Sequence, residues 1–315
     1  MDSRGAGSRS VDTTGVGSRI SVVFPTYGRE SVMVESVRAV LALAEPPFEL
    51  LLIDQTPEHE PETDATLSAL VEGGLVRWIR LATPSITRAM NVGLTESRGE
   101  VVLFLDDDII PQNGLIAAHR AAHDDATRPE RDRMLIAGRV LQPWHLDSSR
   151  PVDRMASSLP GFVEEFMGGN FSVQREAALA LGGFDERFIR VAYRFEAEFA
   201  HRAHKAGWRF PFAPDATIHH LRAERGGTRS YGDHLRTASP GHAVGMYYFL
   251  LRTRPKGWWI QLGVAPFRSV MTRFHVRHPW WIAPALLAQF GGLAWAVWLF
   301  IRGPALIGGD SACRG

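Results

Sequence analysis

The stretch VVLFLDDDII, residues 101–110, decides the fold that we expect for this chain. Five apolar residues are followed directly by Asp106, Asp107 and Asp108, as in a buried parallel strand whose carboxyl end opens to solvent. Ligands of open α/β sheets bind outside the carboxyl ends of the strands, and carboxylate oxygens suit hard divalent cations that hold phosphate. The stretch therefore predicts a metal-dependent phosphate or nucleotide site. A solvated acidic turn before Pro111 fits these ten residues equally well.

The composition is that of a globular enzyme. The chain has 315 residues, of which 45% are hydrophobic and 22% are charged, enough to bury a large core. The net charge is only +1, so no global field favours a nucleic-acid partner, and we expect none. The single cysteine, Cys313, excludes an intrachain disulfide framework and a cysteine-ligated zinc site, and it fits a reducing compartment.

Strands and helices alternate along the first half of the chain, after a Gly-, Ser- and Arg-rich stretch at 1–18 that predicts a disordered tail. Apolar runs predict strands at 20–24, 48–53, 76–81 and 101–105, and helical spacing predicts helices at 31–43, 64–71 and 84–95. This alternation predicts an α/β fold with a mostly parallel sheet flanked by helices. Further on we expect a helix after Pro111 to about His123, a strand at 135–140 and an irregular loop at 143–165 that can cover the site. The segment 168–173 and a helix at 175–181 then lead to a helix at 194–206 and to short extended pieces at 208–212 and 217–220.

The composition changes after about His242. Residues 280–301 form a run of 22 without a charge, long enough to span a bilayer, and tryptophans crowd the region. Pro284, Gln289 and the Gly291–Gly292 pair suit a re-entrant or surface-lying helix equally well, and a helix packed on the domain is the third possibility. We expect membrane contact and leave the topology open. The predicted organisation is a tail at 1–18, a catalytic domain at 19–235, a C-terminal helical, membrane-associating region at 236–305 and a tail at 306–315.

Six stretches in order resemble glycosyltransferase family 2, the inverting nucleotide-sugar transferases with the GT-A fold. They are VVFPTYGRE (22–30), LLLIDQT (50–56), RAMNVGL (88–94), FLDDDIIP (104–111), GGNFSVQREAALALGGFDERF (168–188) and PDATIHH (214–220). Each stretch alone is a weak signal, but the ordered set is not easily accidental. The resemblance covers roughly residues 19–225 and implies a GT-A-type domain.

The resemblance implies a set of donor-binding residues. These are Pro25, Thr26, Tyr27 and Arg29 at the nucleobase, Asp54 at the uracil or ribose, Arg88 and Asn91 on one helix face, Asp106 and Asp107 near the ribose, and Gly169 and Asn170 at the sugar. Each has a plainer alternative. Tyr27 can be an ordinary turn aromatic, Asp54 a cap of the next segment, and Arg88 a solvated charge.

The aspartate-rich stretch matches the family's metal motif. The resemblance implies that Asp108 is the most direct ligand of Mg²⁺ or Mn²⁺, with Asp106 or Asp107 reaching the ribose or a metal-bound water and Asp106 a further candidate ligand. The spacing from Pro214 favours His220 over His219 as a third ligand, although a structural role for His220 is equally possible. A divalent cation suits the chemistry because the leaving diphosphate gains negative charge.

The catalytic base is expected at the start of the helix at 194–206. The family usually has Glu-Asp-x-Asp there, whereas this chain has Phe195, Glu196, Ala197 and Glu198, with two residues apparently inserted upstream. Glu196 falls on the expected base. Glu198 is about 200° further round the helix, so only one of the two can face the site. The departure leaves the choice between Glu196 and Glu198 open.

Other functions also use parts of this pattern. A haloacid-dehalogenase-like phosphatase would use Asp106 and Asp108, but such domains usually open with that strand, and here three strands precede it. A sugar nucleotidyltransferase needs a Gly-rich basic loop that PTYGRES does not provide. A non-catalytic, membrane-attached nucleotide-sugar-binding relic is compatible with the altered acidic motif.

The function that we predict from the sequence is that of an inverting, metal-dependent glycosyltransferase. It moves a sugar from a UDP-, dTDP- or GDP-sugar to a glycan or lipid-linked acceptor, at the cytoplasmic face of a membrane, as a peripheral or single-span protein. The sugar, the base and the acceptor remain open.

Overall fold

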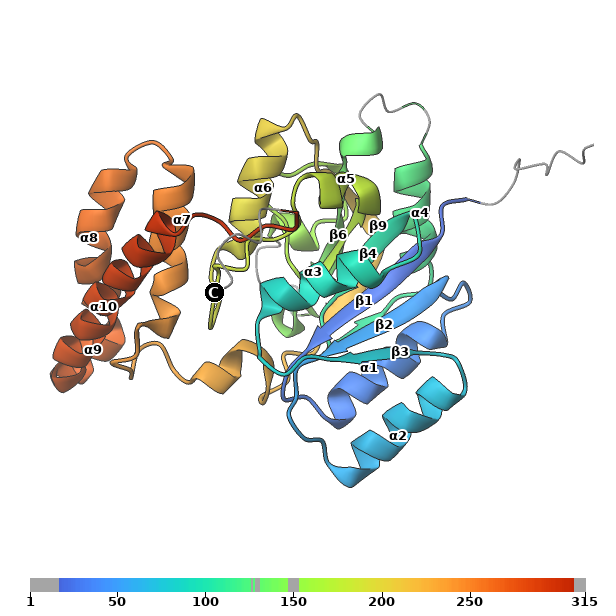
Figure 1. The fold of residues 1–315 in the computed structure, drawn as a ribbon, viewed down its shortest axis with the longest axis horizontal. Coiled ribbons are helices and arrows are strands. Elements are labelled where there is room, and N and C mark those ends of the chain that lie inside the picture. The colour runs from blue at the N-terminus through green and yellow to red at the C-terminus, as the bar shows by residue number, and fades with distance from the viewer. Residues whose placement is uncertain (1–16, 126, 128–130, 147–152, 309–315) are drawn as a thin grey trace, which may run out of the picture.

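The computed structural model describes residues 17–125, 127, 131–146 and 153–308. The tails that were predicted at 1–18 and 306–315 lie mostly outside these residues. A nine-stranded mixed sheet forms the centre of the described chain (Figure 1). Its strands, in sheet order, are β3 (Arg77–Arg80), β2 (Glu49–Asp54), β1 (Ile20–Thr26), β4 (Val101–Leu105), β8 (Asn170–Gln174), β6 (Leu135–Leu141), β9 (Pro211–His220) and β5 (Ile109–Pro111), with β7 (Gly161–Phe162) paired to β9.

The pairing of the strands brings several strand ends to one edge of the sheet. Strands β3, β2, β1 and β4 are parallel neighbours, as the alternating sequence pattern predicted. Strand β8 runs antiparallel to β4 and pairs Asn170 with Leu105, so β8 begins where β4 ends. Strand β9 is parallel to β6, and its last residue, His220, pairs with Ile109 just after the aspartates. Three chain segments therefore meet at the carboxyl end of β4.

The two faces of β4 are buried in two separate apolar clusters, which explains its continuous apolar sequence. Val101, Leu103 and Leu105 pack with the cluster that includes α1 (Ser31–Leu41), α2 (Pro61–Glu72) and α4 (Leu115–Asp124). Val102 and Phe104 pack with the cluster that includes α3 (Ile86–Glu96), α5 (Arg175–Ala180) and α6 (Phe195–Lys205). A strand that is covered on both faces has no polar side, so its successive side chains point alternately into the two apolar clusters.

The structure corrects the prediction of two short extended pieces at 208–212 and 217–220. The chain instead forms one strand, β9, with a bulge: Gly138 pairs with Ala213, but the next residue, Arg139, pairs with Thr217. The buried amide of Asn170 donates to the carbonyls of Arg139 (3.0 Å) and Ala216 (2.8 Å) and so holds the bulge closed. Pro214 and the residues after it interrupt the apolar pattern, which is why the sequence suggested two pieces.

Short helical turns and strands occupy the remaining connections. The region at 143–165, expected as an irregular loop, contains β7 and two of the 3₁₀ turns, and residues 147–152 within it lie outside the described chain. The 3₁₀ turns are Arg131–Arg133, Pro143–Leu146, Arg154–Ala156, Gly227–Tyr231, Pro240–His242 and Pro279–Trp281.

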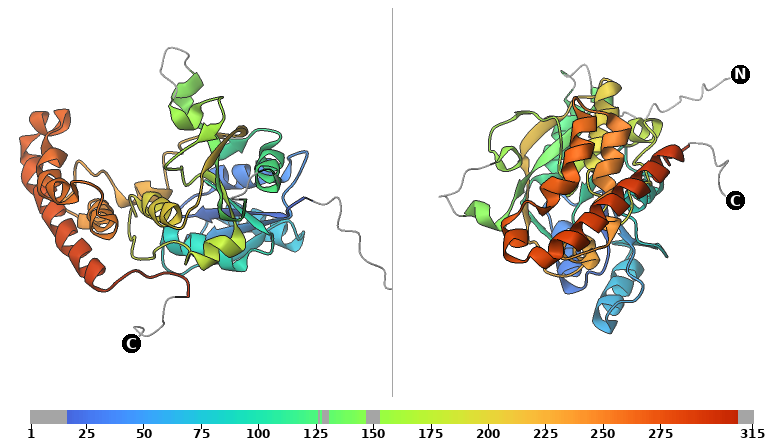
Figure 2. Two further views of the ribbon diagram at one scale, coloured as in Figure 1. Left: turned by 90° about the horizontal axis from the view of Figure 1, so that it is seen from above. Right: turned by 90° about the vertical axis from the view of Figure 1, so that its left-hand side faces the viewer.

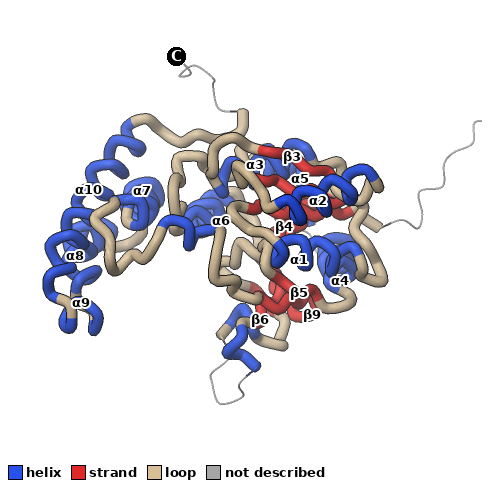
Figure 3. Tube along the Cα trace, turned by 90° about the horizontal axis from the view of Figure 1, so that it is seen from below, coloured by secondary structure: helices blue, strands red, loops and turns tan. Residues whose placement is uncertain are grey.

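Helices α7 (Val244–Thr253), α8 (Trp258–Val270), α9 (Arg273–Arg277) and α10 (Ile282–Ile301) form a layer at one end of the molecule, away from the strands (Figures 2 and 3). Helix α7 packs on α6, and α10 packs on α7 and α8. Buried Asp185 ties this layer to the sheet domain, because its carboxylate accepts hydrogen bonds from the Tyr248 hydroxyl (2.7 Å) and the Ala305 amide (2.9 Å). The chain after α10 thus returns to the domain that carries the sheet.

Replacing Asp185 with alanine is expected to loosen this attachment. The Tyr248 hydroxyl and the Ala305 amide would each lose a partner, and leaving the buried Tyr248 hydroxyl unpaired costs about 1–3 kcal/mol. Chemical denaturation of Asp185→Ala should show this decrease in the free energy of unfolding. Asp215→Ala, at an exposed position in β9, should stay within about 0.5 kcal/mol of the wild type. Equal stability of the two variants would contradict the role given to Asp185.

Candidate active site

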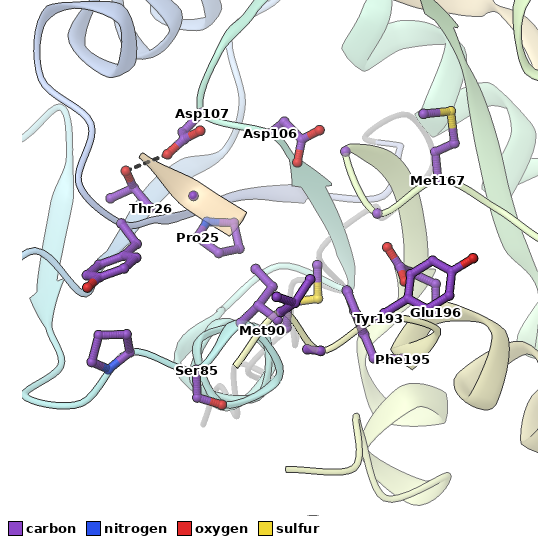
Figure 4. A pocket seen from close by; sticks show the side chains of 18 of the residues that line it. Pro25, Thr26, Ser85, Met90, Asp106, Asp107, Met167, Tyr193, Phe195 and Glu196 are labelled. Carbon is purple, nitrogen blue, oxygen red and sulfur yellow. Dashed lines mark hydrogen bonds between the residues drawn. The ribbon is translucent and has the colours of Figure 1, made fainter. Parts of the chain in front are cut away.

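A cavity of about 530 Å³ opens at the carboxyl end of β1 and β4 (Figure 4). This volume is within the range of about 300–1,000 Å³ that is usual for small-molecule sites. Ten of the residues predicted from the sequence lie on its wall: Pro25, Thr26, Tyr27, Arg29, Asp106, Asp107, Asp108, Gly169, Glu196 and His220. The cavity therefore gathers residues from both halves of the chain.

Asp106, Asp108 and His220 form a group that suits a divalent cation. One ligand atom from each lies within 4.8 Å of the others. The Nε2 atom of His220 is 3.1 Å from Asp108 Oδ1 and 3.8 Å from Asp106 Oδ2. Two carboxylates and one imidazole are a donor set that fits Mg²⁺ or Mn²⁺, so the side chains present suit the cation that the sequence predicted.

A glutamine sets the orientation of His220. The Oε1 atom of buried Gln142 lies 3.1 Å from His220 Nδ1. This contact leaves Nε2 of His220 directed at the two carboxylates. The adjacent His219 contacts Gln112 instead, at 2.9 Å between the two Nε2 atoms, because successive strand residues point to opposite faces. The structure thus distinguishes the two histidines in the way that the spacing suggested.

Asp108 is held as a carboxylate although it is buried. Burial raises its pKa, but the hydrogen bond and charge of His220, the charge of Arg29 and the amide of Ala223, 2.7 Å from Oδ2, outweigh this and lower the pKa. An ionised oxygen is the form that a metal requires. The surroundings of Asp108 therefore favour a ligand role.

Asp107 belongs to the wall of the site. Its carboxylate accepts from Thr26 Oγ1 (2.6 Å) and pairs with Arg29 Nε (3.1 Å). Burial raises the pKa of Asp107 to about 7, although Arg29 and Thr26 both favour the ionised form. Arg29 also lies 3.3 Å from Asp108 Oδ2, so one guanidinium joins both aspartates.

Two glycines separate the aspartates from Glu196. A Cβ at Gly169 would overlap the carboxylate of Asp106, and a Cβ at Gly168 would lie 3.0 Å from Glu196 Oε1. Side chains at these positions would fill the space between the two acids. Glycine is needed at these two positions because the backbone comes close to the carboxylates of Asp106 and Glu196.

Glu196 and Glu198 occupy different environments, as their angle on the helix predicted. Glu196 lies on the cavity wall in the first turn of α6. Burial raises its pKa to about 7, and the negative charge of Asp106 acts in the same direction. Glu198 is only 2% exposed and pairs with Arg202 Nε at 2.9 Å. Arg202 in turn donates to the carbonyls of Leu181 and Gly183, so Glu198 supports a turn of the domain.

Four predicted donor-binding residues are not on the cavity wall described by the structure. Buried Asp54 binds His59 Nε2 (2.8 Å) and Trp78 Nε1 (2.9 Å). Asn91 faces the turn at Phe184, whose amide donates to it at 2.7 Å, and Arg88, three residues earlier, is exposed to solvent. Asn170 is fully buried in the bulge of β9. The structure thus places these four side chains off the cavity wall, and their contacts with a donor stay a prediction.

The structure adds cavity residues that the sequence did not single out, among them Gln55, Glu165, Arg190, Tyr193 and Tyr231. The ring of Tyr231 lies 6.5 Å from that of Tyr27 between centroids. The Gly227 amide donates to the Tyr27 carbonyl at 2.7 Å and so brings this distant loop to the first turn. The only sequence signal was the pair Gly226–Gly227 shortly before an aromatic residue, in ERGGTRSY.

The chain is similar to known glycosyltransferases. Residues 21–166 match the model of the family described as Glycosyl transferase family 2. N-acetylglucosaminyl-diphospho-decaprenol L-rhamnosyltransferase of Mycobacterium tuberculosis, from strains CDC 1551 / Oshkosh and ATCC 25618 / H37Rv, is 35% identical over 92 residues. That match covers 29% of this chain and 27% of the relative.

The likeness to solved structures shows that the chain has the GT-A fold. GalNAc-T7 with UDP, GalNAc and Mn²⁺ gives a TM-score of 0.55 at 14% identity, over 78% of this chain and 52% of that chain. The mannosyltransferase PcManGT of Pyrobaculum calidifontis, in complex with GDP-Man and Mn²⁺, gives 0.54 at 19% identity, over 91% and 80%. Because three strands precede β4 in this fold, the haloacid-dehalogenase-like alternative is no longer supported.

Loss of the Gln142 contact is expected to weaken Mn²⁺ binding without removing a ligand. Groups that orient a metal-bound histidine typically contribute 10–100-fold to metal affinity, so Gln142→Ala should raise the Kd for Mn²⁺ by about that factor. Calorimetry or the paramagnetic signal of free Mn²⁺ measures this. The matched control is Gln112→Ala, which removes the partner of His219 and should leave the Kd unchanged. Equal effects of both variants would contradict the assignment of His220 as the ligand.

Proposed function

We propose that this protein is a metal-dependent, inverting glycosyltransferase. It transfers a sugar from a nucleoside-diphosphate-sugar to a hydroxyl of a glycan or lipid-linked acceptor. The observation that carries the proposal is the placement of the Asp106, Asp108 and His220 group and of Glu196 on the wall of one cavity. The side with Asp106, Asp108 and His220 suits a metal-bound diphosphate, and the side with Glu196 suits removal of a proton from an acceptor hydroxyl.

The donor is proposed to lie along the cavity from Tyr27 to the aspartates. Tyr27 and Tyr231 offer two aromatic faces at the end of β1, where a flat nucleobase gains stacking and apolar contact. Asp106, Asp108 and His220 would hold Mg²⁺ or Mn²⁺, which supplies positive charge against the leaving diphosphate. UDP-, dTDP- and GDP-sugars all suit this arrangement, and the described residues do not select one base.

Glu196 is proposed as the catalytic base. A carboxylate of Glu196 takes the proton of the acceptor hydroxyl as that oxygen forms a bond to the anomeric carbon. The bond between that carbon and the diphosphate oxygen breaks, and its electron pair leaves with the diphosphate. Attack opposite to the leaving group inverts the anomeric centre. Glu198, paired with Arg202, is proposed to keep the helix start in place for Glu196.

A lipid-linked acceptor is favoured by two independent observations. The relative from M. tuberculosis is described as acting on a diphospho-decaprenol acceptor, over a match that covers a quarter of its length. The cavity-lining segment Arg190–Arg194 packs against α7, where a Cβ at Gly245 would lie 2.5 Å from the Tyr193 carbonyl oxygen. The cavity is therefore one helix away from the apolar layer of α8 and α10. We place the reaction at the cytoplasmic face of a membrane, which agrees with the absence of cysteine pairs from the sequence.

Glu196→Gln is expected to abolish transfer while leaving donor binding nearly intact. A lost general base costs about 10²–10⁴ in rate, and the amide keeps the size of the side chain. Turnover with a radiolabelled donor and separate nucleotide titration measure the two effects. The matched variant is Glu198→Gln, which should lower stability through the Arg202 pair and retain most of kcat. If folded Glu198→Gln protein loses kcat while Glu196→Gln keeps normal activity, Glu198 and not Glu196 is the catalytic base.

The transfer rate is expected to rise with pH through about 7. The pKa of Glu196 is raised to about 7, and the base acts only when it is ionised, so protons inhibit below that value. The profile of kcat should fall about tenfold per pH unit well below 7 and level off above about 8. A profile that stays flat from about pH 5.5 to 8, with binding unchanged, would contradict a base with the environment of Glu196.

A further inference from the structure

The C-terminal helical layer carries an extreme charge bias. Residues 234–309 contain eight Lys and Arg residues and no Asp or Glu, although the whole chain has a net charge of only +1. The rest of the chain therefore has a net charge of −7. Seven of the eight are exposed: Arg236, Arg254, Lys256, Arg268, Arg273, Arg277 and Arg302. This surface is complementary to an anionic partner.

The same layer exposes a continuous apolar face. Large side chains of α10 point outward at intervals of three, four or seven residues and so share one side of the helix: Leu287, Phe290, Val297, Trp298 and Ile301. Helix α8 exposes a similar stripe, Trp259, Ile260, Val264 and Phe267. The rings of Phe267 and Phe290 lie 6.5 Å apart between centroids, so the two stripes adjoin. We call these nine residues the outer apolar face.

The opposite side of α10 is committed to the protein. The segment Pro279–Ile301 is long and apolar enough to cross a membrane, and in its 18-residue window of mean hydropathy 1.6 the buried share is 28%. The buried residues are small and lie on one side: Ala285, Ala288, Gly292 and Ala296, with Leu299. A Cβ at Gly292 would lie 2.7 Å from that of Ala243, and the Tyr247 hydroxyl donates to Gln289 at 2.7 Å.

Attachment at its C-terminal end also keeps α10 close to the sheet domain. The Ala305 amide binds Asp185 and the Ile307 amide binds the Gly182 carbonyl (2.8 Å), directly after the helix. To cross a bilayer, α10 would have to leave α7 and these contacts. A helix that lies in the interface keeps them all and covers only its outward stripe.

We propose that the outer apolar face inserts into one leaflet of an anionic bilayer, with α10 parallel to the membrane plane and the basic residues around it on the lipid headgroups. Amphipathic helices with basic flanks bind in this way through apolar burial plus attraction to anionic lipid. Arg302 lies 4.6 Å from the Trp298 ring, and Arg254 lies 5.6 Å from the Phe300 ring, so charge and apolar surface are adjacent. The proposal concerns the site of action and holds whatever the sugar is.

The test is flotation of the full chain with liposomes of phosphatidylcholine alone and with about one third phosphatidylglycerol. The wild type should float with the anionic vesicles, and several-fold less with the neutral ones. Raising the salt from about 0.1 M to about 1 M should weaken the anionic binding, because the screening length falls from roughly 10 Å to roughly 3 Å. Failure to float with anionic vesicles would overturn the proposal.

Variants identify the face. Leu287→Ser combined with Trp298→Ser should reduce partitioning at least tenfold, whereas Leu75→Ser, an exposed leucine on the sheet domain, should not change it. Thermal unfolding confirms that the variants fold, and nucleotide titration with Mn²⁺ is made in parallel. Normal nucleotide binding without flotation would refute the membrane inference and leave the proposed function standing. Flotation without nucleotide binding would support the membrane inference and contradict the proposed function.

Two further outcomes would contradict the in-plane arrangement. Membrane-bound protein that resists extraction at alkaline pH would show that α10 spans the bilayer. A concentration-dependent dimer that is lost in the double variant, without flotation of the wild type, would show that a second copy of the chain covers the outer apolar face.

Discussion

The concentration of negative charge at the end of β4 is the constraint on which the site depends. Three carboxylates follow a fully buried strand, and one buried guanidinium, Arg29, contacts Asp107 and Asp108 together. Arg29 also donates to the carbonyls of Ala223 and Arg225, so the turn after β1 and the loop after β9 are held at the same place. Burial and the neighbouring carboxylates raise the pKa of Asp107 to about 7, so gathering three acids here carries a cost, and a divalent cation would offset the negative charge of the ionised ones.

The first half of the fold could be predicted because its rules are local. Buried parallel strands are continuous apolar runs, and the helices between them have their own period. The second half depends on strand pairings that no local pattern encodes. The β9 bulge is closed by Asn170 from another strand, and His220 meets Asp108 only because β9 pairs with β5. The sequence carries both residues but not their register.

The site shows the same division. Asp106, Asp108, His220 and Glu196 lie on one cavity wall, and the sequence could single them out because the order of the motifs and the angle between helix positions are readable in it. Asn91 was placed on the right helix but on a face that packs on Phe184, and a spacing of three residues cannot decide which way a face turns. Tyr231 comes from a loop that reaches the cavity through backbone contacts with the turn at Tyr27. Such contacts depend on tertiary structure alone.

Helix α7 links the chemistry to the apolar end of the molecule. It packs on the cavity-lining segment through Gly245 and on α10 through Tyr247 and the residue before the helix, Ala243. A displacement of α7 would therefore change its contacts with both the cavity-lining segment and α10. The basic residues are concentrated in the C-terminal helical layer, and the acidic residues lie in the remainder of the chain.

The most direct test of the central claim is calorimetric titration of the purified protein with UDP, dTDP and GDP, each with Mn²⁺ and with EDTA. The account predicts that one nucleotide binds only with Mn²⁺, and that Asp108→Ala weakens this binding at least tenfold. Absence of binding to a folded protein at high micromolar nucleotide, or binding that is indifferent to EDTA, would contradict the site at the end of β4.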